Sequence, residues 1–293
     1  MRRIVTAAMA LAMLGLCVTA AGQSLRVGSV TNTRFGDNWT LDGPQMANTR
    51  AKLLNTTNFG AGGTVPKANV ITDTAGTVGS VTGSLLANFD VFFIGYLDDA
   101  NVNAFTPAEL SAMQAWVNGG GTMIVTCDSD SYDAVCASFG HPATGGSPGI
   151  NPIVPTAAGS AHALFNGPFG TVTAINEVGT QGAFTSTTGA TVLAQDSTPG
   201  TPLPVVLVQQ IGAGRVVFLS DVDLIANGLS AGATITSQND RFLGNLFAFA
   251  GGFAAAPAPV LQPVPALSPA NLALLALAIA AMAIGMRRRI ARR

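Results

Sequence analysis

Basic side chains are scarce in the central part of this 293-residue chain. Of its 14 lysines and arginines, two lie at the extreme N-terminus and five close the chain, so seven remain in the body beside all 15 acidic residues. A body with a net charge of −8 argues against nucleic acid or an anionic lipid surface as the partner of the folded domain. The shortage of lysine and the abundance of glycine, threonine, serine and alanine are typical of an exported protein.

Cysteine and histidine are also rare. Cys17 lies in the N-terminal apolar run, which leaves only Cys127 and Cys136 in the body. In an oxidising compartment such a pair favours a disulfide, and two thiols alone make a poor metal site. The chain has only two histidines, His141 and His162, so few catalytic bases are available.

Nucleotide-binding loops are missing as well. The glycine-rich stretches 60–63, 119–121 and 212–214 lack both G-x-x-x-x-G-K-[ST] and a strand–G-x-G-x-x-G–helix context. We therefore interpret them as turns.

The N-terminus has the layout of a secretory signal peptide. Arg2 and Arg3 precede an apolar run over residues 4–18, and small residues follow at 20–22. A positive start, a short apolar stretch and a small-residue cleavage site predict that residues 1–22 are removed by signal peptidase.

The C-terminus predicts a membrane anchor. A proline-rich linker, residues 254–269, leads to an apolar segment, 270–286, and a basic tail, 287–293. The fifteen apolar residues 272–286 span roughly 22 Å as a helix, against a hydrocarbon core of about 30 Å, so the flanking arginines must reach toward the interface. Because basic residues stay inside, we expect the tail in the cytoplasm and the body outside. The membrane-stop residues are Arg287, Arg288 and Arg289.

The linker also carries a short motif. Its residues that fit the pattern I-P-x-L-S are Val264, Pro265, Leu267 and Ser268. Followed by an apolar segment and an arginine cluster, they resemble the IPTL-CTERM sorting domains of Gram-negative bacteria, relatives of the PEP-CTERM tails. The resemblance implies an exosortase-like sorting protease as partner. It places the protein either in the cytoplasmic membrane with the body outside or at the cell surface after sorting. The usual continuation is replaced by residues 269–271, so a simple anchor stays an alternative.

Strand and helix signals alternate through the body, residues 24–253. The predicted strands are 25–30, 68–72, 90–96, 122–126, 192–194, 205–209 and 215–219. The predicted helices are 44–54, 106–117, 131–139 and 240–250. Thr106, Pro107 and Glu109 form a capping box at the start of the second helix. This alternation predicts an α/β fold with a mainly parallel, doubly wound sheet and helices on both faces.

Four body segments carry a family resemblance. They are DVFFIGYLDD (90–99), TPAELSAMQAWVNGGGTMIVTCDS (106–129), GAGRVVFLSD (212–221) and DRFLGNLFAFAGG (240–252). Together they resemble the class I glutamine amidotransferase-like fold, in its ThuA-like or exported branches. The resemblance implies a flavodoxin-like sheet. It does not fix an activity, because this fold hosts enzymes and non-enzymes alike.

Cys127 is the candidate nucleophile that the resemblance suggests. In the enzymes of that fold a cysteine on the turn after a central strand attacks an acyl carbon, and Cys127 follows the strand 122–126. Asp128 and Asp130 would raise the pKa of its thiol, and no histidine follows the strand 215–219. A Cys127–Cys136 disulfide or two buried thiols are the alternatives.

Three pairs of aspartates follow predicted strands. They are Asp98 and Asp99, Asp128 and Asp130, and Asp221 and Asp223. The carboxyl ends of such strands form the edge where ligands bind in open α/β sheets. The carboxylates either bind Ca²⁺, Mg²⁺ or a polar ligand there, or cap helix N-termini. Asp37, Asn38 and Trp39 in the first loop would join this edge, with Trp39 as a stacking surface for a sugar. No other cofactor is predicted.

These observations favour an exported, membrane-sorted cell-surface protein. We expect its α/β domain to bind a ligand, with extracellular polysaccharide as a candidate partner, rather than to catalyse a reaction. One alternative is a cysteine- or metal-assisted hydrolase working at the same edge. The other is a structural component of an extracellular matrix.

Overall fold

The computed structural model describes most of the body. The described residues are 24–35, 38–96, 105–127, 134–144, 147–148, 152–176, 178–197, 200 and 202–253. They all belong to the first of two compact units, residues 1–255 and 256–293. Within them no helix is long and apolar enough to cross a membrane. The predicted signal peptide, apolar segment and basic tail lie outside the described residues.

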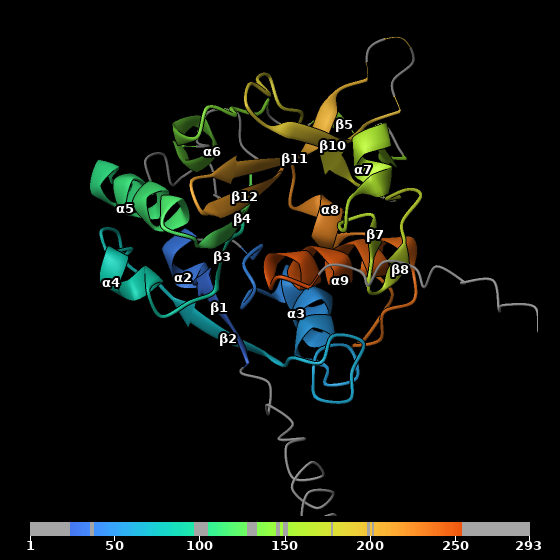
Figure 1. Cartoon of the computed structure of the whole chain (residues 1–293), viewed down its shortest axis with the longest axis horizontal. Coiled ribbons are helices and arrows are strands. Elements are labelled where there is room, and N and C mark those ends of the chain that lie inside the picture. Colours follow the sequence, from blue (N-terminus) through green and yellow to red (C-terminus); the bar gives the residue numbers. More distant parts are fainter. Residues whose placement is uncertain are drawn as a thin grey trace, which may run out of the picture. The chain divides into compact units, whose positions relative to one another are not determined.

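The body is built on an eight-stranded sheet with the order β2-β1-β3-β4-β12-β11-β10-β6 (Figure 1). The parallel strands are β2 (Asn69–Thr74), β1 (Leu25–Val30), β3 (Val91–Ile94), β4 (Thr122–Thr126) and β12 (Gly214–Leu219). The antiparallel strands are β11 (Pro204–Ile211), β10 (Thr191–Gln195) and β6 (Val154–Pro155). The parallel part has the doubly wound, flavodoxin-like order, in which β1 lies between β2 and β3. The mainly parallel sheet predicted from the sequence is confirmed.

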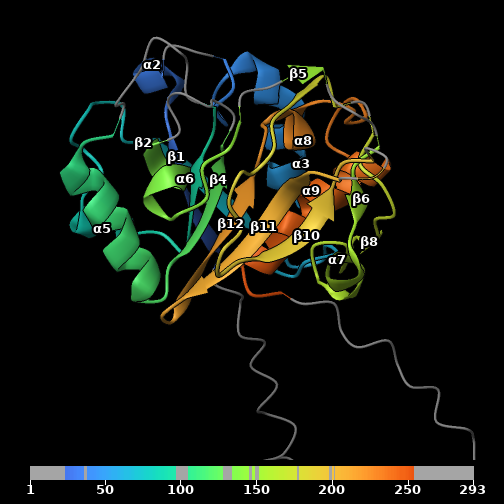
Figure 2. The same ribbon diagram turned by 90° about the horizontal axis from the view of Figure 1, so that it is seen from above.

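Helices cover both faces of the sheet (Figure 2). One face carries α3 (Ala47–Leu54), α8 (Asp223–Ala226) and α9 (Gln238–Ala250). The other carries α4 (Gly83–Leu86), α5 (Pro107–Asn118) and α6 (Ala134–Ser138). The remaining described elements are short. They are the helices α2 (Asn32–Phe35) and α7 (Ala157–Ala161) and a 3₁₀ turn (Pro44–Met46). Two small antiparallel ladders pair β5 (Ser147–Pro148) with β9 (Thr180–Gln181) and β7 (Asn166–Gly167) with β8 (Gly170–Thr171).

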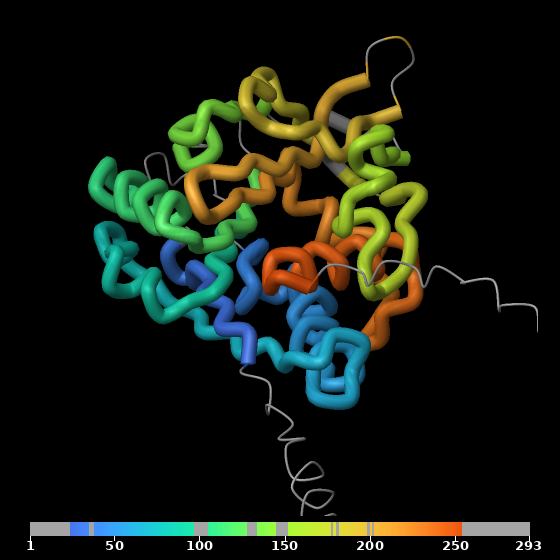
Figure 3. The backbone as a smooth tube through the Cα atoms, in the orientation of Figure 1, coloured from blue at the N-terminus to red at the C-terminus, as the bar shows by residue number. Residues whose placement is uncertain are grey.

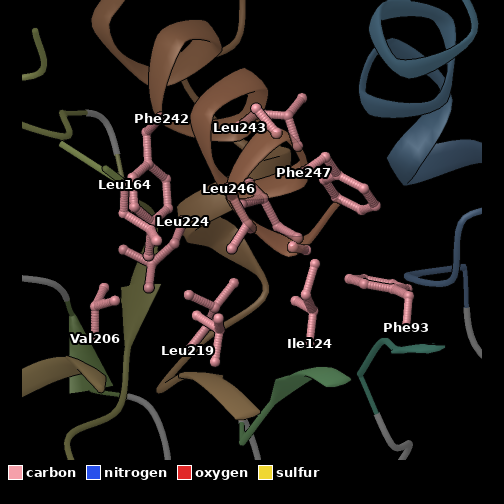
Figure 4. Packing of buried hydrophobic residues seen from close by; sticks show 14 of the residues in the cluster. Phe93, Ile124, Leu164, Val206, Leu219, Leu224, Phe242, Leu243, Leu246 and Phe247 are labelled. Carbon is pink, nitrogen blue, oxygen red and sulfur yellow. The ribbon is translucent and has the colours of Figure 1, made fainter. Parts of the chain in front are cut away.

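The central strands are buried on both faces because they are apolar throughout. Every residue of β3 and β4 is buried, which only a strand between two helical layers can be. Against one face α9 packs Leu243, Leu246 and Phe247, and Figure 4 shows these side chains above Phe93 and Ile124 of the sheet. A second core cluster fills the opposite face under α5.

The predicted helix start at Thr106 is confirmed. Thr106 Oγ1 accepts from the Glu109 amide, and Glu109 Oε2 accepts from the Thr106 amide, which closes a capping box. Ser237 and Asp240 form the same arrangement at the start of α9. Each box satisfies amides that the helix cannot pair internally.

A tight turn brings β12 into the sheet. Ile211 pairs with Gly214, so Gly212 and Ala213 alone connect β11 to β12, and Gly212 has a φ of 56°. Glycine adopts such a φ at little cost, and a Cβ there would lie 2.4 Å from Asn118 Oδ1. The turn places β12 beside β4, far away in sequence, as the backbone tube in Figure 3 shows.

The described residues between 140 and 200 contribute more to the core than the sequence indicates. Their glycine, proline and threonine content predicts a loose stretch, yet Ile153, Phe165 and Ile175 are completely buried in the core under α9. Helix α4 is also missing from the prediction, because four residues are too few to show a period. The predicted helix 44–54 begins with a 3₁₀ turn, and its α-helical part starts at Ala47.

The two ends of the body meet at the amino edge of the sheet, where the parallel strands begin. Leu25 opens β1, and Gly251 directly follows α9. A Cβ on Gly251 would lie 2.9 Å from Leu25 Cδ2, so the two ends touch. The carboxyl edge, where the parallel strands end, lies on the opposite side.

Candidate functional site at the carboxyl edge

Two of the six predicted edge aspartates lie in the part that the structure describes. Asp221 and Asp223 follow β12 and are 1% and 7% exposed. Asp221 Oδ1 accepts from the backbone N–H of Asp223 at 2.8 Å, at the start of α8. The N-cap residue of α8 is Val222, which makes no side-chain capping bond, so the Asp221 contact is a turn of the Asx type that precedes the helix. The remaining predicted edge residues, Asp98, Asp99, Asp128 and Asp130, lie outside the described residues, as does Asp37.

Backbone covers the edge above β12. A Cβ on Gly179 would lie 2.9 Å from Asp223 Oδ2, and one on Gly182 would lie 3.0 Å from the Ser220 carbonyl oxygen. The chain over residues 179–182 therefore lies directly on these groups. Among the described residues, no group of three histidine, cysteine, aspartate or glutamate side chains is placed to hold a metal ion.

Cys127 and Cys136 are joined in a disulfide, with their Cα atoms 5.9 Å apart. Both residues are completely buried, and the Cys127 amide donates to the Leu219 carbonyl at 2.7 Å. The bond links the end of β4 to α6. A sulfur in this form offers no thiolate, and the thiolate is the nucleophilic form of cysteine. Beside it, the hydroxyls of Thr126 and Ser220 are buried with no hydrogen-bond partner among the described residues.

The strongest polar contact of this edge joins Arg34 to Glu109. Arg34 Nη1 and Nη2 donate to the two Glu109 carboxylate oxygens at 2.8 and 3.0 Å, and both side chains are 1% exposed. The guanidinium carbon also lies 4.4 Å from the centre of the Phe105 ring. A bidentate pair of this kind fixes the loop after β1 against the start of α5.

Glu109 remains ionised despite its burial. Burial alone would raise its pKa, but the Arg34 guanidinium and the amides of Thr106 and Val81 outweigh that effect and lower the pKa to about 2. Sequence reasoning identified Glu109 only as a cap. Nothing local marks Arg34 as its partner, because the two residues are 75 positions apart.

Arg34 also holds the end of β2. Its Nη1 lies within hydrogen-bond distance of the carbonyl oxygens of Ala75 and Thr77, at 3.4 and 3.1 Å. Ala75 has a φ of 56°, a left-handed backbone that is unfavourable for alanine. Three loops are thus tied to one buried cation.

The first loop closes over the end of β3. Asp42 Oδ1 accepts from the Asn32 amide at 2.9 Å and from Thr40 Oγ1 at 2.6 Å. A Cβ on Gly95 would lie 2.4 Å from the Trp39 carbonyl oxygen, so loop and strand end are in direct contact. Trp39 is half-buried and packs against the core under α9, which makes it a packing residue here.

Both histidines take part in packing contacts. The His141 ring is buried, with its nitrogens 3.1 Å from the Ser186 carbonyl oxygen and 3.0 Å from Gln209 Oε1. The His162 ring lies 4.7 Å from the Phe249 ring, and burial followed by the Arg215 charge lowers its pKa. The described edge therefore offers buried structural polar groups and no assembled catalytic set.

Comparison with known proteins identifies the tail. Residues 262–289 match the family model of the IPTL-CTERM motif, so the motif predicted from Val264, Pro265, Leu267 and Ser268 is confirmed. This motif implies an exported, membrane-associated surface protein that a sorting machinery processes. No curated protein matches the chain.

Solved structures similar to the body show its fold. The N-terminal domain of mmIFT52 has a TM-score of 0.51 and 10% identity, with 78% of this chain and 96% of that chain covered. A ThuA-like protein from Bacteroides uniformis has a TM-score of 0.49 and 13% identity, with 78% and 91% covered. A ThuA-like protein from Parabacteroides merdae has a TM-score of 0.46 and 10% identity, with 81% and 93% covered. At such identities the likeness concerns the fold alone.

Proposed function

We propose that this protein is an exported binding protein, held at the membrane by its C-terminal tail with the body outside. Signal peptidase removes residues 1–22, residues 270–286 form the transmembrane anchor, and an exosortase-like protease recognises the linker motif. The observation that carries this proposal is the IPTL-CTERM motif at residues 262–289. The charge distribution supports it, because five arginines follow the apolar segment 270–286.

The body, in this proposal, is an amidotransferase-like domain that binds and does not catalyse. The disulfide at Cys127 supports this role, because it occupies the sulfur that the enzymes of that fold would use. The Asp221 contact supports it as well, because its Oδ1 accepts from the backbone amide of Asp223 in its own turn.

Cell fractionation tests the sorting. The full chain is expressed in a Gram-negative host with a sorting protease, and the double variant Pro265→Ala, Leu267→Ala is compared with Pro259→Ala, a linker proline outside the motif. We expect the double variant to stay in the membrane at its unprocessed size, while Pro259→Ala behaves as the wild type. Equal processing of all three chains contradicts sorting through the motif. A body resistant to added protease in spheroplasts contradicts export.

Hydrolysis assays test the absence of catalysis. The full-length protein is assayed on amide, ester and glycan substrates with and without a thiol reductant, beside Cys127→Ser and Cys136→Ser. We expect no turnover in any sample. Activity that appears on reduction, survives in Cys136→Ser and is lost in Cys127→Ser would establish the hydrolase alternative instead.

Calorimetry with and without Ca²⁺ or Mg²⁺ tests whether a cation binds at the carboxyl edge. Because it uses the whole protein, the test also covers the predicted aspartates that lie outside the described residues. A rise in the melting temperature that Asp221→Asn abolishes would add a metal to the proposed binding role.

A further inference from the structure

A pocket opens at the amino edge of the sheet, on the side opposite the predicted site. It has a volume of about 420 Å³ and lies between the start of β3 and the turn after α5. Its lining residues are Phe89, Asp90, Trp116, Gly119, Gly120 and Gly121. The volume falls within the range of roughly 300–1,000 Å³ that is usual for small-ligand sites.

One wall of the pocket is a tightly held indole. A Cβ on Gly121 would lie 2.3–2.6 Å from three atoms of the Trp116 ring, so the ring packs directly on the glycine backbone. Phe92 meets the same ring edge-on, with the centres 6.5 Å apart. Trp116 is nevertheless only half-buried. A fixed, partly exposed aromatic ring loses little entropy when a flat apolar surface stacks on it.

The polar side chain of the lining is Asp90, which forms an exposed ion pair with Arg26, a residue outside the lining. Arg26 Nη2 donates to Asp90 Oδ1 at 2.7 Å, and the Arg26 amide donates to Asp90 Oδ2 at 2.9 Å. The two side chains are 51% and 34% exposed, so both remain accessible to solvent. The guanidinium offers only donors and the carboxylate only acceptors. Because the charges cancel, the pair suits a neutral ligand whose neighbouring hydroxyls both donate and accept.

We infer that this pocket binds a pyranose ring of a neutral extracellular saccharide, with the apolar C–H face on Trp116 and hydroxyls on Asp90, whose charge Arg26 balances. The inference rests on the proposed function in one respect: an extracellular saccharide reaches the pocket only if the body is exported. The described lining holds one carboxylate, whereas glycoside hydrolysis uses two, so the site binds the sugar without cleaving it.

Tryptophan fluorescence tests the inference directly, because Trp39 and Trp116 are the only tryptophans of the chain. Trp39→Phe leaves Trp116 as the sole reporter, and Trp116→Phe leaves Trp39. The full-length proteins, in a detergent without a sugar headgroup, are titrated with cellohexaose, maltohexaose and chitohexaose. We expect at least one of these probes to produce a saturable change in Trp39→Phe and none in Trp116→Phe. No saturable change up to ~10 mM with any of the three, near the weak limit of useful affinity, overturns the inference.

Pocket variants with matched controls locate the site by calorimetric titration. Gly119→Gln places a side chain in the pocket, and its Cβ meets only ordinary contacts at 3.4 and 3.5 Å. Gly62→Gln is the control, because a Cβ there has nothing within 4 Å. We expect the first to abolish binding and the second to leave it unchanged. Equal binding by both chains overturns the assignment of the pocket.

The ion pair has its own control. Asp90→Asn removes the charged acceptor, and Asp73→Asn breaks the comparable pair with Arg50 away from the pocket. We expect about tenfold weaker binding for the first, the loss typical of one hydrogen bond to a charged group, and no change for the second. Weakening by both variants alike points to a general charge effect and contradicts the site. Cell fractionation measures sorting, and these titrations measure sugar binding. A failure of the proposed sorting and a failure of the proposed sugar site can therefore be told apart.

Discussion

The two edges of the sheet use their charged residues in opposite ways. At the carboxyl edge the Arg34–Glu109 pair is 1% exposed on both sides, and it binds loops of the protein itself. At the amino edge the Arg26–Asp90 pair is 51% and 34% exposed beside an open pocket. The edge where α/β proteins usually bind ligands is thus filled by its own chain wherever the structure describes it, while the opposite edge keeps charged atoms accessible.

The difference has a simple energetic origin. A buried pair has lost its hydration, so each partner depends on the other, and removing one leaves an uncompensated charge. An exposed pair keeps most of its hydration, is screened by salt, and contributes little to folding. The buried pair at the carboxyl edge therefore holds loops in place, and the exposed pair at the amino edge stays accessible.

Loss of one buried partner should have the largest effect. Glu109→Ala leaves the Arg34 guanidinium buried without its carboxylate, and we expect the free energy of unfolding to fall by about 3–5 kcal/mol. Urea denaturation followed by circular dichroism measures the loss. The double variant Arg34→Met, Glu109→Leu removes both charges and should recover part of the stability, because the Thr106 and Val81 amides still lose their acceptor. A single variant as stable as the wild type would show that the pair does not hold the edge.

Acidification should weaken the same contact. The pKa of Glu109 is about 2 in the folded protein, against 4.5 without its partners. A lowered folded pKa means that the stabilisation is complete above pH 4.5 and is lost as the pH falls toward 2. The shift corresponds to about 3 kcal/mol. We expect the difference in urea midpoint between the wild type and Glu109→Gln to shrink steadily between pH 5 and pH 2.5. A constant difference contradicts the assignment.

Loss of the disulfide should have the next largest effect on stability. The bond closes a short loop, since its cysteines are 9 positions apart, and a loop of that length gives about 2–3 kcal/mol in the chain-entropy view. We expect the double variant Cys127→Ser, Cys136→Ser to melt at a lower temperature than the wild type, and to be insensitive to a thiol reductant. A wild type that melts at the same temperature with and without reductant would show that the bond adds nothing to stability.

Local patterns predicted much of the sheet. The strand 122–126 and the capping box of Thr106 and Glu109 are as expected, because the apolar run and the cap residues lie next to one another in the chain. The mainly parallel sheet with helices on both faces follows from the alternation of strands and helices. The tail motif was also recognisable, since it is contiguous.

Contacts between residues far apart in the chain could not be predicted from such local patterns. Lys52 is completely buried, with its Nζ 3.5 Å from Asp240 and 2.6 Å from the Ser230 carbonyl oxygen, although nothing near it in sequence indicates a partner. The aspartates that follow the strands were predicted either to bind a cation or polar ligand or to cap helix N-termini, and the sequence left these two roles open. The sequence could not show that Asp221 binds an amide of its own turn.

The amino-edge pocket was missed for the same reason. Trp116 lies on α5 and Asp90 directly precedes β3, so the two residues come together only through the packing of α5 against the sheet. The clue that sequence offers is the glycine run after Trp116, which we interpreted as a turn alone. Gly121 is in fact the surface on which the indole rests.

The smallest effects on stability should come from the pocket itself. Asp90→Asn breaks an ion pair that water already solvates, and Gly119→Gln meets no close contact, so we expect both urea denaturation curves to superimpose on that of the wild type. The same two variants are those expected to weaken or abolish sugar binding. A clear loss of stability in Asp90→Asn would show that the amino-edge pair holds the fold as the carboxyl-edge pair does, and the contrast between the two edges would disappear. Unchanged stability with lost binding separates recognition at one edge from structural support at the other.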